Sequence, residues 1–200
     1  MMRTTAGLLS LALLATLPVA AHAHLVNSGL GPFYNGTLHL LLSPGDLLTV
    51  LALGLLAGQS GKASARWAAV MLPLVWGGAA LAGLLLGTAP APGWIGVALL
   101  ILLGALVAAG VRLPPSVMAS LAALTGLVHG LDNAGAFVAS DSAPVAIAGI
   151  ASGVLILTLL TAALAVSPRA DWTRIALRVG GSWIAAIGML MLGWLLQSTG

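Results

Sequence analysis

The stretch that decides the fold class is residues 143–166, APVAIAGIASGVLILTLLTAALAV, which contains no charged side chain. An α-helix needs about 20 apolar residues to cross the hydrocarbon core of a bilayer, and this run is long enough. The rest of the chain has the same character, since 60% of its 200 residues are hydrophobic and only 6% are charged. Soluble domains carry roughly a quarter charged residues. We therefore expect an all-α, polytopic membrane protein.

Five further apolar runs accompany this one, and segments rich in glycine, proline or polar residues separate them. Each run is close to the length that a membrane helix requires. The shortest connection, Ser140-Asp141-Ser142, predicts a tight hairpin between the fourth and fifth helices. We expect residues 37–200 to form one membrane domain, a bundle of six transmembrane helices at residues 37–58, 67–87, 94–111, 116–139, 143–166 and 177–196.

Residues 1–23 have the three parts of a cleavable signal peptide. Arg3 supplies the positive charge, residues 6–19 form the apolar part, and Ala21-His22-Ala23 is a cleavage site of the A-x-A type. The alternative is a signal anchor that stays attached as an extra span, but the short apolar stretch favours cleavage. Cleavage would make His24 the first residue of a short periplasmic segment, residues 24–36.

A histidine at the mature N-terminus offers its amine and its imidazole together. This bidentate nitrogen pair suits nickel, copper or zinc. The alternative is that His24 simply follows the cleavage site in a solvated tail. Both interpretations are compatible with the sequence.

The lysines and arginines predict the orientation of the bundle. Apart from Arg3, all of them fall in the first, third and fifth predicted loops or at the adjoining helix ends. Cytoplasmic loops are enriched in such residues, so these loops face the cytoplasm and both mature termini are periplasmic. A cleaved signal peptide requires the same external N-terminus. We predict a bacterial inner-membrane protein whose partner is the lipid bilayer and not nucleic acid, because the bases lie at span ends and form no patch: Lys62, Arg66, Arg112, Arg169, Arg174 and Arg178.

Ionisable residues at membrane depth are costly, and they therefore mark functional candidates. They occur in two predicted spans, His39 and Asp46 in the first, and His129 and Asp132 with the amide of Asn133 in the fourth. On a continuous helix the first pair would share one face, and the second set has the i, i+3, i+4 spacing of neighbours. Both sets fall in the outer half of the membrane. If the two helices touch, their polar groups lie at the same depth.

The chemistry of this set suits a divalent transition metal. Two imidazoles and two carboxylates, in a chain without cysteine, are ligands for nickel, cobalt or zinc. Ser43-Pro44-Gly45 interrupts the first span just before Asp46, and broken helices beside charged groups form substrate sites in many carriers. We expect a metal ion as substrate, with no cofactor required. The alternative is that these residues are buried hydrogen-bonding groups that only join helices.

Two short stretches, Gly31-Pro32-Phe33-Tyr34-Asn35-Gly36-Thr37-Leu38-His39 and Val128-His129-Gly130-Leu131-Asp132-Asn133-Ala134-Gly135, resemble the HupE/UreJ family. These are six-span proteins encoded with hydrogenase or urease systems and regarded as nickel or cobalt permeases. The resemblance implies that function, His39 and His129 as ligands, and hydrogenase or urease accessory proteins as partners. Asn133 stands where the family has a second histidine and Ala136 where it has a glutamate. Asp46 and Asp132 are hypothetical replacements.

Two other functions are open to a protein of this kind. One is a non-transporting accessory or assembly factor for a metalloenzyme system, which would be restricted to membrane partners or short loops. The other is an intramembrane hydrolase that uses Ser152 and His129. The rhomboid pattern of Gly-x-Ser is absent from Ile150-Ala151-Ser152-Gly153, and the sixth predicted span has no histidine. We therefore expect no enzymatic activity.

Overall fold

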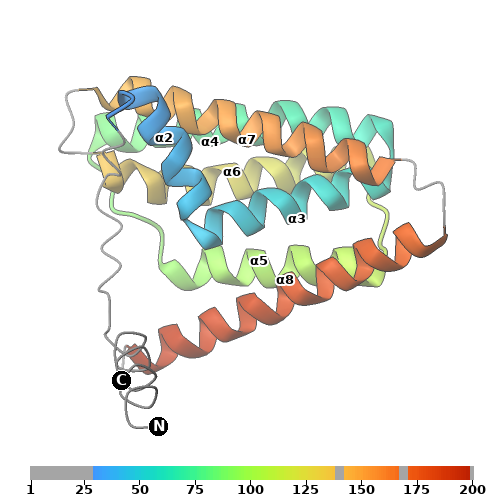
Figure 1. The fold of residues 1–200 in the computed structure, drawn as a ribbon. Helices are drawn as coiled ribbons and strands as arrows, with labels where there is room; N and C mark the ends of the chain where they lie inside the picture. The colour runs from blue at the N-terminus through green and yellow to red at the C-terminus, as the bar shows by residue number, and fades with distance from the viewer. Residues whose placement is uncertain (1–28, 138–141, 167–170, 199–200) are drawn as a thin grey trace, which may run out of the picture.

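The computed structural model describes residues 29–137, 142–166 and 171–198, which form seven α-helices (Figure 1). The predicted signal peptide and His24 lie outside the described residues. The all-helical fold class is confirmed. The helices are α2 (Pro32–Leu42), α3 (Pro44–Ser60), α4 (Lys62–Leu86), α5 (Gly93–Ala109), α6 (Pro115–Phe137), α7 (Ala143–Val166) and α8 (Asp171–Ser198).

Three of the described helices, α4, α7 and α8, are long and apolar enough to cross a membrane. The bent pair α2 and α3 passes the same test together and would make a fourth span, while α5 is a shorter apolar helix. The chain is therefore a multi-pass membrane protein. The number of six spans stays a prediction.

The interruption predicted in the first span, residues 37–58, is confirmed, but it is sharper than a kink, because two separate helices meet at Ser43. Ser43 is extended (φ −92°, ψ 99°), and α3 begins at Pro44. A proline ring clashes with the helical conformation of the residue before it, so the helix ends there. The axis turns by 79° at this break. His39 and Asp46 therefore do not share a helical face.

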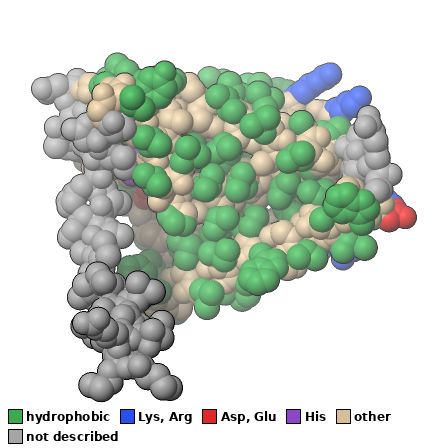
Figure 2. All heavy atoms as spheres, viewed as in Figure 1, with side chains coloured by type: hydrophobic (Ala, Val, Ile, Leu, Met, Phe, Trp, Pro, Cys, Tyr) green, Lys and Arg blue, Asp and Glu red, His purple; other side chains and the backbone are tan. Residues whose placement is uncertain are grey.

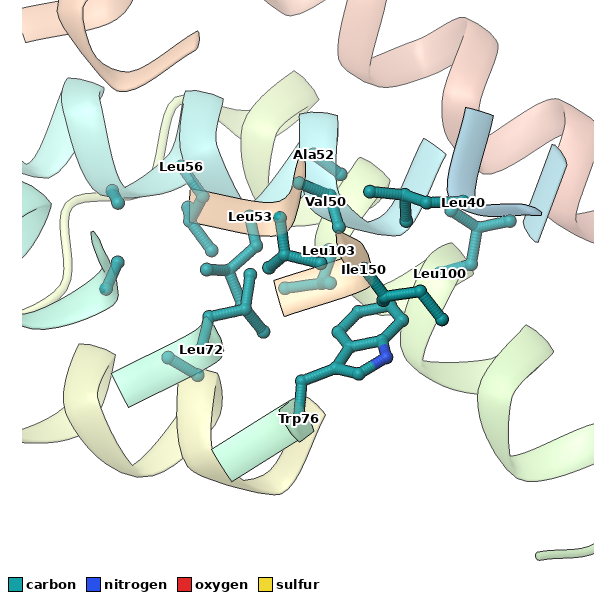
Figure 3. Close-up of a cluster of buried hydrophobic side chains, with 14 of the residues drawn as sticks. Leu40, Val50, Ala52, Leu53, Leu56, Leu72, Trp76, Leu100, Leu103 and Ile150 are labelled. Atoms are coloured by element: carbon teal, nitrogen blue, oxygen red, sulfur yellow. The ribbon is translucent and has the colours of Figure 1, made fainter. Parts of the chain in front are cut away.

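The helices pack as a bundle with α3 near its centre (Figure 1). The strongest pairings are α4 with α6, α5 with α8, and α7 with α2, α3 and α4. The interior between them is filled by fully buried side chains such as Leu53, Leu72, Trp76, Leu100 and Leu103 (Figure 3). These come from α3, α4 and α5, and α3 contacts each of the other two helices.

Glycines bring the packed helices into backbone contact. A Cβ atom on Gly54 of α3 would lie 1.9 Å from Thr161 Oγ1 on α7, and one on Gly104 of α5 would lie 2.6 Å from the Ala185 nitrogen on α8. Neither space can hold even a methyl group. Helices in lipid gain nothing from moving apolar surface away from water, so they associate by such close packing at small residues.

The lysines and arginines of the described residues lie at one end of the bundle, where α3, α5 and α7 end and α4, α6 and α8 begin. Figure 2 shows blue side chains at this end of the molecule. The set consists of Lys62, Arg66, Arg112, Arg174 and Arg178. This segregation is the charge distribution that the positive-inside rule uses, and we call this the basic end.

Substituting Gly104 with alanine will destabilise the α5–α8 contact. The added methyl group meets backbone atoms of α8, which cannot move aside, and overpacking of this kind costs about 1–3 kcal/mol. The measurement is thermal unfolding of the detergent-solubilised protein. Gly193→Ala is the matched control, since Gly193 lies on α8 with nothing within 4 Å of its added Cβ. Equal melting temperatures for the two variants would contradict the packing role of Gly104.

Candidate functional site

Asp46 lies in the first turn of α3, directly after the break at Ser43. The carboxylate is largely buried, since the Asp46 side chain is 14% exposed. The unpaired N–H groups at a helix start favour a negative charge, which offsets part of the cost of burying it. The sequence of the break, Ser43-Pro44-Gly45-Asp46, therefore places a carboxylate where the backbone stabilises it.

His129 of α6 meets Asp46 directly. Its Nδ1 is 2.7 Å from Asp46 Oδ1, and its side chain is 6% exposed. One turn further along α6, Asn133 Nδ2 donates to Asp46 Oδ2 at 3.1 Å and to the His129 carbonyl at 2.8 Å. Both oxygens of the carboxylate thus accept a hydrogen bond. The structure brings these three predicted residues together across α3 and α6.

The hydrogen bond to Asp46 occupies one ring nitrogen of His129 and leaves the other available to bind a ligand. An ionised carboxylate only accepts hydrogen bonds, so Nδ1 carries the proton, and Nε2 of the neutral ring presents a lone pair. His129 Nε2 is buried and has no partner among the described residues, and the same holds for Asn133 Oδ1. Metal-binding histidines are oriented in this way, with the second ring nitrogen bonded to a carboxylate.

Asp132 lies beside the same histidine, and Gly96 of α5 reveals the shared space. A Cβ on Gly96 would lie 3.8 Å from His129 Nε2 and 4.0 Å from Asp132 Oδ2. Both atoms therefore border the space that a side chain at residue 96 of α5 would occupy. Asp132 is only partly buried, so this carboxylate connects the buried histidine with the protein surface.

His39 does not join this group. It is buried on α2, and its ring packs edge-on against Phe137 with centroids 5.4 Å apart. Within the described ranges no hydrogen bond or ion pair links it to Asp46 or His129, and the break at Ser43 directs α2 away from the line of α3. Among the described residues, no group of three or more His, Cys, Asp or Glu side chains is placed to hold a metal ion. The donor set around His129 is thus incomplete, and Asn133 is its only amide.

The sequence reasoning missed Trp76, which contacts the site, and Thr49, which follows Asp46 on α3. Trp76 of α4 stacks on the His129 ring, with centroids 5.0 Å apart and planes inclined by 26°, and Figure 3 shows its indole in the core. Thr49, one turn after Asp46, is fully buried, and its hydroxyl has no partner among the described residues. Trp76 lies in the middle of a predicted span, away from the interfaces that tryptophan prefers, and this position was the available signal.

The serine of the hydrolase alternative is elsewhere. Ser152 Oγ donates to the Ala148 carbonyl at 2.8 Å on its own helix, α7. His129 is bonded to Asp46 through Nδ1. A nucleophilic serine requires a base within hydrogen-bonding reach, and within the described residues this pairing does not form.

Comparison with known proteins identifies the family. No curated protein and no solved structure matches the chain. The family model described as HupE / UreJ protein matches residues 11–191, which is nearly the whole chain and includes every residue of the site described above. The resemblance inferred from the two short stretches is confirmed. The chain belongs to the HupE/UreJ family.

Proposed function

We propose that this protein is a membrane permease for a divalent transition metal, with nickel or cobalt as its substrate. The observation that carries the proposal is the buried His129 imidazole, whose Nδ1 is bonded to Asp46 and whose Nε2 has no partner among the described residues. A lone pair held in this way binds a borderline metal ion such as Ni²⁺ or Co²⁺. The HupE/UreJ family is associated with nickel and cobalt transport or with accessory functions.

The ligands of the site suit transient binding of a metal ion that passes through the protein better than permanent binding. His129 Nε2, Asp132 and Asn133 Oδ1 offer nitrogen and oxygen donors without sulfur, and they fall short of a full coordination shell. An ion held by such a set keeps part of its water, so it can leave again. The family association also includes accessory proteins, for which hydrogenase or urease systems would supply the partners.

The membrane arrangement we propose has six spans after a cleaved signal peptide, in a bacterial inner membrane, with both mature termini periplasmic. The segregation of the described lysines and arginines at one end supports it. Asp46 lies in the first turn of α3, and the basic end lies where α3 stops at Ser60. The site therefore faces the periplasmic half, where an entering ion would meet Asp132 first.

Substituting His129 with alanine will reduce uptake of radiolabelled nickel and cobalt to the level of cells without the protein, because the nitrogen ligand is lost. Uptake is measured in whole cells at matched protein abundance in the membrane. Asp171→Ala is the control, since that exposed aspartate pairs with Arg174 at the basic end. Wild-type uptake by the His129 variant would refute a permease that uses this site. No uptake by the wild-type protein, together with a stoichiometric partner on purification, would favour the accessory function.

Substituting Asp46 with asparagine will weaken metal affinity without removing a ligand. The amide still occupies the space but no longer carries the charge that orients and polarises His129, and changes of such supporting groups cost roughly 10- to 100-fold in metal affinity. The concentration for half-maximal uptake rises, while uptake at saturating metal is retained. Loss of the maximal rate with unchanged half-saturation would show that Asp46 acts in another way.

Single cysteines will report the orientation, because the natural chain has none. Thr88 is exposed after α4, and Ser116 is exposed at the opposite end, in the first turn of α6. In intact spheroplasts a membrane-impermeant maleimide labels Thr88→Cys but not Ser116→Cys, and permeabilisation exposes both. The reverse pattern would overturn the proposed orientation.

A further inference from the structure

A second polar feature lies at the basic end, where a cavity of about 470 Å³ opens between helices. Volumes of this size are typical of ligand pockets, which span roughly 300–1,000 Å³. The cavity exists because α8 packs chiefly on α5, whereas α7 packs on α2, α3 and α4. The end of α7 and the start of α8 are thereby separated, and Gln59 of α3 and the α5–α6 connection complete the lining.

Positive charge predominates in the lining. Arg112, Arg174 and Arg178 border the cavity, together with one carboxylate, that of Asp171. Asp171 pairs with Arg174, and Arg178 Nε donates to the Ala108 carbonyl at 2.8 Å. Arg112 is exposed and has no carboxylate partner among the described residues. The surplus of guanidinium groups in the lining favours an anion over a cation.

The segment that carries Arg112 is held firmly in place. Gln59 Nε2 donates to the Val111 carbonyl at 2.8 Å, on one side of Arg112. On the other side, the Leu113 N–H donates to Ser60 Oγ at 3.0 Å, and Ser64 Oγ donates to the Leu113 carbonyl at 3.0 Å. Three side chains from the α3–α4 corner thus fix the backbone on both sides of the arginine. Less ordering is therefore required when Arg112 binds a ligand.

The remaining walls are apolar, and they include Ala109, Ala165, Val166, Ile175 and Leu177. An anion that is small and fully hydrated gains nothing from such walls. A molecule with an anionic head and an apolar body fits both parts of the lining. A second, smaller groove of about 240 Å³ lies beside the same end of α7, and it combines Lys62 and Arg66 with Leu159 and Val166. Neither Lys62 nor Arg66 lines the larger cavity.

We propose that the cavity binds the phosphate-bearing headgroup of an anionic phospholipid in the leaflet at the basic end. The planar guanidinium group of Arg112 can offer paired hydrogen bonds to phosphate oxygens, while Arg174 and Arg178, which already have partners, add positive charge. Basic pockets between membrane helices on the cytoplasmic side are suited to such headgroups. This site is independent of the metal site, since Asp46 and Gln59 stand at opposite ends of α3, roughly 20 Å apart at 1.5 Å per residue.

The experiment is native mass spectrometry of the full-length, signal-processed protein in detergent. Equal concentrations of dioleoylphosphatidylglycerol and dioleoylphosphatidylcholine are the probes, and circular dichroism checks that each variant is folded. We expect the wild-type protein to retain phosphatidylglycerol preferentially. Arg112→Ala lowers that affinity roughly fivefold, the effect of one basic residue near an anionic headgroup. Arg66→Ala, the matched control, removes the same charge outside the cavity and has a smaller effect.

Three results would overturn the proposal. Equal retention of the two lipids shows that the headgroup charge is not recognised. Equal losses for Arg112→Ala and Arg66→Ala show that only the overall charge of the basic end matters. Full displacement of phosphatidylglycerol by millimolar inorganic phosphate shows that the cavity takes a soluble anion and not a lipid. Preferential binding that depends on Arg112 and survives added phosphate supports the lipid site.

Discussion

The close contact between α4 and α6 is the constraint on which the site depends. A Cβ on Gly126 would lie 2.9 Å from the Trp76 nitrogen, and one on Gly130 would lie 2.4 Å from the Trp76 carbonyl oxygen. The two glycines therefore fix the backbone of Trp76 against α6 on either side of His129. Because apolar side chains are as well solvated by lipid as by each other, this steric fit is what holds the two helices together. The stacking of the indole on the imidazole is a consequence of it.

Burial of the Asp46 carboxylate is the main electrostatic cost in the interior. A buried charge is tolerated when it is paired and hydrogen-bonded. Here the start of α3, His129 Nδ1 and Asn133 Nδ2 all offer it protons or positive potential. These partners satisfy the carboxylate but leave His129 Nε2 and Asn133 Oδ1 without partners in the described structure. Buried acceptors without partners lower the stability of the fold, and they suit a cation.

The two polar regions divide the molecule along α3. Its first turn carries Asp46 and the site with His129, and its last turn carries Gln59, which supports the segment around Arg112. The imidazole of His129 and the carboxylates of Asp46 and Asp132 thus belong to one end, and the guanidinium groups, with the Asp171 carboxylate, belong to the other. The fully buried leucines and Trp76 lie between them (Figure 3). In the arrangement we propose, this division separates the metal site from the anionic leaflet.

The sequence by itself determined the helical membrane fold, the family, and the placement of His129 and Asn133 on one face of one helix. All of these follow from periodicity or local motifs, which act within a single helix. The proline at residue 44 predicted a kink, but the 79° turn, and with it the loss of His39 from the site, depends on how α2 packs against α7. Trp76 and Gly96 border the site from α4 and α5. The cavity at Arg112 exists because α7 packs on α2, α3 and α4 whereas α8 packs chiefly on α5. Contacts between helices depend on which helix surfaces meet, and the spacing of residues within one helix does not specify this. Only the tertiary structure therefore decided these contacts.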